Sequence, residues 1–141
     1  MSGEGILQQG FREIEHAADW EIEVWAPDLP GLFIEAARGL YVLSGTKLNQ
    51  FDEGTSYEFE IPFTNPESIL VAFLNELLFQ SEHNWIGITN LELDINDSRF
   101  QARGLALPLL SKNEDIKAVT FHHLEIKQVS SRLETHIIFD V

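Results

Sequence analysis

The sequence predicts an α+β domain in which two helices pack on a mixed, largely antiparallel sheet. Segments typical of strands and of helices are interleaved, but without the regular alternation of a doubly wound parallel sheet. Several expected strands follow one another across short turns, which is the connection of an antiparallel hairpin. With 141 residues and 44% hydrophobic content, the chain is long enough to bury a sizeable core. We therefore expect a single domain over residues 1–141.

Two strands are predicted at the start of the chain, over residues 11–16 and 20–26. The short corner Ala17-Ala18-Asp19 joins them. Every second residue from Trp20 to Ala26 is apolar, which is the period of a strand with one buried face.

Two helices are predicted, and each has a local start signal. Asp28-Leu29-Pro30-Gly31 opens the first, because Pro30 suits a first helical turn, and Gly45 is its expected stop. Asn65-Pro66 opens the second, which runs to about residue 83. Apolar residues recur at three- and four-residue steps in both: Phe33, Ala36, Ala37, Leu40 and Leu43 in the first, and Leu70, Phe73, Leu74, Leu77 and Leu78 in the second.

The remaining strands are a lone strand and two hairpins. They are expected over residues 55–61, 86–95, 99–107, 116–128 and 133–141. The first hairpin turns at Asn96-Asp97-Ser98 and the second at Ser130-Ser131, both of which are polar turn sequences. A polar connector over residues 108–115 separates the two hairpins.

The charge balance limits the classes of partner. Nine basic residues against 23 acidic ones give a net charge of -14, which disfavours direct nucleic-acid binding and anionic membranes. An acidic surface would attract a basic protein partner. The alternative is that the negative charge serves only to keep the protein in solution. The absence of cysteine excludes disulfides and thiolate metal sites. No apolar run has membrane-spanning length and the N-terminus lacks the order of a secretory signal, so we expect a cytoplasmic protein.

Carboxylates near the two ends of the sequence are candidate metal ligands. The last predicted strand places the Asp140 side chain and the α-carboxylate of Val141 at the end of an ordered element, and Asp19 follows the first strand. If the fold brings these groups together, a hard cation such as Ca²⁺, Mg²⁺ or Mn²⁺ would offset their repulsion. The alternative is that Asp19 is a turn residue and Asp140 belongs to a solvated strand end.

Two further residues are candidates for the same site. His16 could orient Asp19 through a hydrogen bond, bind the metal or act as a base; a structural role is the alternative. Lys117 could pair with the acidic cluster or reach a phosphate or a partner carboxylate; a solvated strand end is the alternative. His122 and His123 would project to opposite faces of a strand and so would not share a metal.

No local motif identifies catalytic machinery. The sequence has no G-x-S-x-G elbow, P-loop, G-x-G-x-x-G or H-E-x-x-H, and no nucleophile stands out.

Four segments, in order along nearly the whole chain, match motifs of one known family. They are Glu15-His16-Ala17-Ala18-Asp19, Leu74-Asn75-Glu76-Leu77-Leu78-Phe79, Lys117-Ala118-Val119-Thr120-Phe121-His122 and the closing Phe139-Asp140-Val141. Together they resemble the archease family, with its H-T-A-D element, its second-helix stretch, its K-A-x-T-Y-H element and its terminal aspartate. The chain departs from these motifs at Ala17 and Phe121, where threonine and tyrosine are usual, and at Trp20, where smaller aliphatic residues are common.

The resemblance implies a strand-helix-strand-strand (SHS2-like) module and an accessory, non-enzymatic function. Archeases activate the RtcB-type RNA ligase, a GTP- and Mn²⁺-dependent enzyme of tRNA splicing and RNA repair. They promote guanylylation of a ligase histidine and so restore multiple turnover. By this resemblance, Asp19, Asp140 and Val141 would hold a divalent cation, commonly Ca²⁺, with His16 and Lys117 in supporting or partner-facing roles. The partner would be the ligase itself, with no stable nucleic-acid binding and no membrane.

Two other functions stay open from the residues alone. A small metal-dependent phosphoester hydrolase would use Asp19, Asp140 and His16, and it would need an open metal position and a water-activating base. A chaperone-like binding module would use the acidic surface and exposed aromatic residues such as Trp25.

Overall fold

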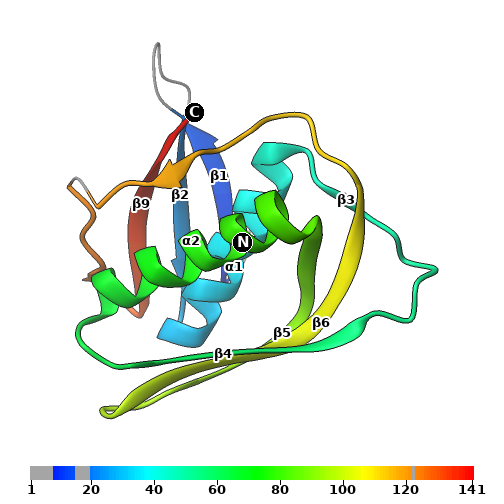
Figure 1. Cartoon of the computed structure of the whole chain (residues 1–141). Coiled ribbons are helices and arrows are strands. Elements are labelled where there is room, and N and C mark those ends of the chain that lie inside the picture. Colours follow the sequence, from blue (N-terminus) through cyan, green and yellow to red (C-terminus); the bar gives the residue numbers. More distant parts are fainter. Residues whose placement is uncertain (1–7, 15–19, 122) are drawn as a thin grey trace.

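The computed structural model describes residues 8–14, 20–121 and 123–141, which form two helices and two sheets (Figure 1). The elements in chain order are β1 (Gly10–Ile14), β2 (Trp20–Ala26), α1 (Leu29–Ser44), β3 (Lys47–Leu48), β4 (Thr55–Pro62), α2 (Pro66–Asn84), β5 (Ile86–Ile95), β6 (Arg99–Ser111), β7 (Ala118–Val119), β8 (Lys127–Val129) and β9 (Arg132–Asp140). All strand pairs in the described part of the chain are antiparallel. The α+β class is confirmed, but the strands form two sheets instead of one.

The first sheet has the strand order β1-β2-β9-β7, and β8 also pairs with β9. Trp20 at the start of β2 lies opposite Phe139 near the end of β9. Ile22, Val24 and Ala26 are buried, as the alternation along β2 predicts. The last strand in the sequence therefore lies inside this sheet, between β2 on one edge and β7 and β8 on the other.

Both helices begin where the local signals predict. The Asp28 side chain accepts a hydrogen bond from the Gly31 N–H at 2.8 Å, and the Asn65 side chain accepts one from the Ser68 N–H at 2.9 Å. These bonds satisfy N–H groups that have no partner within the helix. At the other end of α1, Gly45 adopts the left-handed conformation that closes a helix, with φ of 66°.

In the second sheet, β6 pairs with β3, β4 and β5. β6 extends to Ser111, so the prediction of a polar connector from residue 108 is wrong in its first half. Pro108 lies within the strand, opposite Ile86, and its carbonyl accepts a hydrogen bond from the Asn49 N–H at 2.8 Å. The connector between the sheets is therefore residues 112–117, which we call the β6–β7 connector.

The predicted strand over residues 116–128 is also wrong, because the chain forms two short strands there. β7 and β8 both pair with β9, and between them the chain turns at His123, whose φ is 57°. The buried side chain of Leu124 attaches this segment to the core. His123 thus lies in a turn, and His122 lies outside the described residues. The predicted turn at Ser130-Ser131 is confirmed.

The helices lie between the two sheets, and one cluster of buried side chains joins all of these elements (Figure 1). Its centre is aromatic. The ring centroid of Phe100 on β6 is 5.5 Å from that of Phe33 on α1 and 5.3 Å from that of Phe73 on α2. These three side chains are 0% exposed, so the apolar stripes predicted for the helices do face the core.

Candidate functional site

The anionic residues predicted at the end of the last strand lie at one end of the first sheet. Asp140 is the last residue of β9, and Val141 follows it; both are exposed. Figure 1 shows this point beside the end of β1 and the start of β2. The carboxylate of Asp140 therefore projects from an ordered strand end rather than from a loop.

The backbone of Lys117 lies next to the backbone of Asp140. The Lys117 N–H donates a hydrogen bond to the Asp140 carbonyl oxygen at 2.8 Å, and Ala118 lies opposite Asp140 in the β7–β9 pair. The Lys117 side chain is exposed, and no described carboxylate forms an ion pair with it. The structure thus brings two of the predicted positions together, and it leaves the Lys117 ammonium group facing solvent.

The other two predicted positions, His16 and Asp19, lie outside the described residues. Trp20, which follows Asp19 in the chain, lies opposite Phe139, which precedes Asp140. The sequence neighbours of the two aspartates are therefore paired across the β2–β9 ladder.

The described donors at this end of the sheet fit a hard divalent cation by their chemistry. The Asp140 side chain supplies oxygen atoms only, as would the α-carboxylate predicted at Val141, and such donors suit Ca²⁺, Mg²⁺ and Mn²⁺. Among the residues that the structure describes, no group of three histidines or acidic residues could hold a metal. A complete protein site would therefore need a donor from outside the described residues, and Asp19 is the candidate for it.

An acidic face adjoins the same end of the sheet. The side chain of His136 on β9 lies 2.7 Å from Glu21 and 3.5 Å from Glu23, both on β2. Glu23 also accepts a hydrogen bond from Arg12 of β1 at 2.7 Å. Because residues two and four apart in a strand share a face, Asp140 lies on the same face of β9 as His136. No local pattern in the sequence marks His136, since its contacts depend on the pairing of distant strands.

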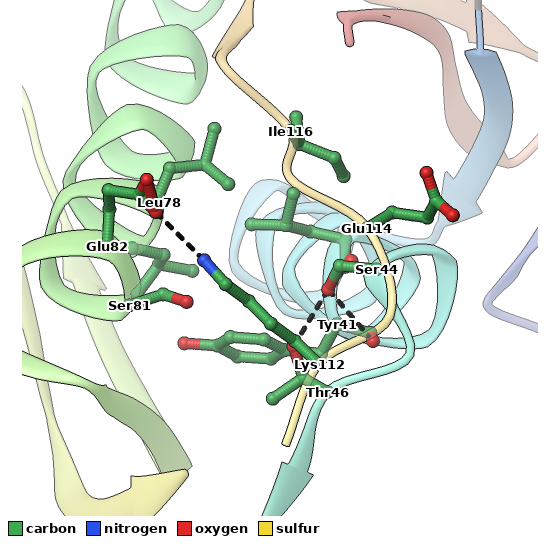
Figure 2. Close-up of a pocket in the computed structure, with 11 residues that line it drawn as sticks. Tyr41, Ser44, Thr46, Leu78, Ser81, Glu82, Lys112, Glu114 and Ile116 are labelled. Carbon is green, nitrogen blue, oxygen red and sulfur yellow. Dashed lines mark hydrogen bonds and ion pairs between the residues drawn. The ribbon is translucent and has the colours of Figure 1, made fainter.

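A second polar cluster lies between α1 and α2, around Lys112 of the β6–β7 connector (Figure 2). Its Nζ is 2.9 Å from a carboxylate oxygen of Glu82 on α2 and 3.3 Å from one of Asp115, and its side chain is only 12% exposed. In Figure 2 the lysine extends from the connector to Glu82. The cavity beside it holds about 10 Å³, which is room for a single water molecule. The cluster therefore fastens the connector to α2 and is too small for an organic ligand.

We expect Lys112→Met to lower the free energy of unfolding at pH 7 by about 1 kcal/mol, because the two acceptors are themselves exposed and screened. Burial lowers the pKa of Lys112, but the hydrogen bonds and charges of Glu82 and Asp115 outweigh burial and leave that pKa above its usual 10.5. The stabilisation is therefore fully present below the unfolded-state pKa, and it is lost only as pH rises through the raised folded value. Urea denaturation measures this loss. Between neutral and mildly alkaline pH, the difference in free energy of unfolding between Lys112→Met and the wild type should be constant.

Lys127→Met is the matched control for this prediction. Lys127 is 63% exposed and its Nζ lies 3.8 Å from Glu125, so its loss should not change stability measurably. If the free energy of unfolding fell equally in the two variants, or did not fall in Lys112→Met, the connector would not be fastened by this lysine.

Asn75 of α2 has a structural role that the sequence did not reveal. Its side-chain oxygen accepts a hydrogen bond from the Val119 N–H at 2.9 Å, and its amide nitrogen donates one to the Val119 carbonyl at 3.5 Å. This pair of bonds holds β7 against α2. In the sequence Asn75 and Glu76 are two polar residues between Leu74 and Leu77, and nothing local distinguishes the role of Asn75 from that of a solvated helix residue.

The fold and the site together describe a small α+β protein that presents exposed carboxylates at the end of an antiparallel sheet. The sequence model of the Archease protein family matches residues 11–141. The chain therefore belongs to the archease family. It is 25% identical to the archease of Methanopyrus kandleri, over 93% of this chain and 99% of that one. It is 26% identical to the archease of Methanosarcina barkeri over the whole of both chains.

Two solved structures have the same fold. A crystal structure of an archease and possible chaperone from Thermotoga maritima matches with a TM-score of 0.70 and 21% identity, over 92% of this chain and 96% of that one. The solution structure of protein 1598 from Methanobacterium thermoautotrophicum matches with a TM-score of 0.67 and 23% identity, over 94% of this chain and 99% of that one. Neither described helix is long and apolar enough to cross a membrane.

Proposed function

We propose that the chain is a non-enzymatic accessory protein that activates an RNA ligase of the RtcB type. It would do so by promoting guanylylation of the ligase histidine, which sustains multiple turnover in tRNA splicing or RNA repair. One observation supports this most strongly: the exposed carboxylate of Asp140 projects from an ordered strand, where the neighbours of Asp19 and Asp140 are paired. Membership of the archease family supports the choice of partner.

In this proposal Asp19, Asp140 and the α-carboxylate of Val141 hold a divalent cation, with Ca²⁺ preferred over Mg²⁺ or Mn²⁺. A bound cation would supply positive charge that lets the carboxylates lie close together. Asp140 presents its oxygens from a rigid strand, and Lys117 and His16 serve as orienting or partner-facing groups. Fixed groups lose little conformational entropy when a partner binds, so the strand end suits a docking site.

The chain would act by binding one state of the ligase more tightly than another. An accessory protein shifts an equilibrium only by the difference between its affinities for the two states. The net charge of -14 would attract a basic surface of the ligase and would repel free RNA. The acidic end of the first sheet would then favour the guanylylated state without taking part in bond formation.

The test is RNA ligation by the cognate ligase with and without this protein. With the ligase limiting, we expect product to exceed the ligase concentration only when this protein is present. The guanylylated fraction of the ligase should rise in parallel, measured with labelled GTP. Equal product in the two reactions, under conditions where the ligase completes its first turnover, would refute the proposal.

The same reactions distinguish the other functions considered. Incubating the protein alone with phosphoester substrates and Mg²⁺ or Mn²⁺ tests a hydrolase, and the proposal expects no turnover. The description of the Thermotoga maritima archease as a possible chaperone suggests a second control. An unrelated chaperone should not replace this protein in the ligation assay if the effect is specific.

A further inference from the structure

A groove with apolar walls lies where α1, β3 and β5 meet, and its volume is about 500 Å³. The apolar residues that line it are Ile34, Ala37 and Val42 of α1, Leu48 of β3, and Ile88 and Leu91 of β5. Val42 is 59% exposed, so part of this apolar surface is in contact with solvent. A groove of this volume has room for an aromatic side chain.

The walls of the groove are fixed by contacts within the chain. The Ile88 N–H donates a hydrogen bond to the Tyr41 hydroxyl oxygen at 3.0 Å, which joins β5 to α1. The register of β5 against β6 shifts after Thr89, and Asn90 at this bulge has a φ of 54°. Tyr41, Ile88, Thr89 and Asn90 all line the groove. Because these features are present without an occupant, the groove is preformed, and little energy would be lost in ordering it.

The β3–β4 loop carries a fully exposed aromatic side chain close to this groove. Phe51 is 100% exposed, and it lies three residues after Leu48, which lines the groove. The loop is ordered by its own hydrogen bonds. The Phe51 N–H donates to the Asn49 side chain at 3.1 Å, and the Gly54 N–H donates to the Asp52 side chain at 2.8 Å. Figure 1 shows this loop extending beyond the second sheet, so Phe51 is presented to solvent and does not fill the groove of its own chain.

The charges on the loop and around the groove are complementary. None of the described residues that line the groove is acidic, although the chain has 23 acidic residues. Arg38 lines the groove and is paired with Glu35 at 2.7 Å, so this pair adds no net charge. Lys47 of β3 is exposed and forms no ion pair with a described carboxylate. The loop carries two exposed carboxylates, Asp52 and Glu53. In a chain with a net charge of -14, this groove is therefore a surface that an acidic loop can approach.

We propose that two copies of this chain form a twofold-symmetric dimer in which the Phe51 side chain of each copy inserts into this groove of the other. A surface that carries both a projecting side chain and a groove that fits it is self-complementary, which is what a twofold interface requires. The groove is built from α1, β3 and β5, whereas Asp140 lies on β9. The inference therefore does not depend on the proposed function of the acidic strand end.

The test is sedimentation equilibrium of the full chain from micromolar to millimolar concentration, which measures the Kd of the dimer. Phe51→Ser should raise this Kd by about 100-fold, because twofold symmetry removes two insertions at about tenfold each. Phe79→Ser is the matched control. Phe79 is also an exposed phenylalanine, at 48%, but it lies on α2 outside the groove, so its loss should leave the Kd unchanged.

A mixture of two variants tests the reciprocal insertion itself. Val42→Glu places a charge in the groove but keeps Phe51, whereas Phe51→Ser keeps the groove intact. Each variant alone should lose both insertions. In a heterodimer of the two variants one insertion forms again, so its Kd should be about tenfold lower than that of either variant alone. Circular dichroism and the melting temperature show that each variant is folded, which is expected because both side chains are exposed.

Four results would overturn the inference, whatever the protein does to a ligase. The wild type could stay monomeric throughout the concentration range. Its mass could rise beyond two copies, which would indicate an open chain of copies instead of a closed pair. Phe51→Ser could dimerise like Phe79→Ser, which would place the interface elsewhere. The mixture of variants could dimerise no better than either variant alone, which would exclude reciprocal insertion.

Discussion

Asp140→Asn is expected to reduce activation of the ligase at saturating protein by about tenfold or more. Asparagine keeps the size of the side chain but removes the charge, and loss of a carboxylate from a hard-cation site costs at least about 10- to 100-fold in metal affinity or activity. Asp19→Asn should have the same effect if both residues hold one ion. The measurement is the multiple-turnover rate at a protein concentration well above half-saturation.

The matched control is Asp97→Asn. Asp97 is another exposed aspartate, but it lies in the β5–β6 turn and outside the acidic end of the first sheet. We expect Asp97→Asn to activate normally. Both variants should unfold within about 0.5 kcal/mol of the wild type, because both side chains are exposed. If Asp140→Asn and Asp97→Asn activated the ligase equally, Asp140 would have no special role.

Phe73→Ala is expected to lower the free energy of unfolding by about 3–5 kcal/mol. Phe73 is 0% exposed, and its ring lies 5.3 Å from that of Phe100 and 6.0 Å from that of Phe33. Its truncation would leave a cavity where α1, α2 and the second sheet meet. The loss is a large fraction of the stability of a typical domain, so the variant should be partly unfolded at physiological temperature.

Urea or guanidinium denaturation measures this loss, and Phe79→Ala is its matched control. Phe79 lies on the same helix but is 48% exposed, so its truncation should cost about 1 kcal/mol or less. Comparable losses for the two variants would mean that the core is not centred on the three aromatic rings.

The helices could be predicted from the sequence because their signals are local. Asp28, Asn65 and Gly45 each act through bonds to residues a few positions away, and those bonds are present. The division of the strands into two sheets has no such local signal. β3 spans only Lys47–Leu48, which is too short to show a period, and Pro108 indicated a strand end although the strand continues to Ser111.

The candidate site could be predicted in part, for the same reason. Asp140 and Lys117 stood out by residue type, and their backbone contact follows from the pairing of β7 with β9. The roles of His136 and Asn75 could not be foreseen, since each bonds to a residue on an element far away in the sequence. Local pattern identifies donors, whereas the register of distant strands decides which donors meet.

The interior position of β9 has a consequence for biosynthesis. This strand holds β2 on one edge and β7 and β8 on the other, so the first sheet has no partner strand for β2 except β1 until residue 140 has left the ribosome. The edge of β2 that pairs with β9 has no partner strand while the chain between them is synthesised. We therefore expect the first sheet of the nascent polypeptide to fold cooperatively, and only once β9 is available. A premature stop shortly before β9 should yield an aggregation-prone fragment rather than a smaller folded protein.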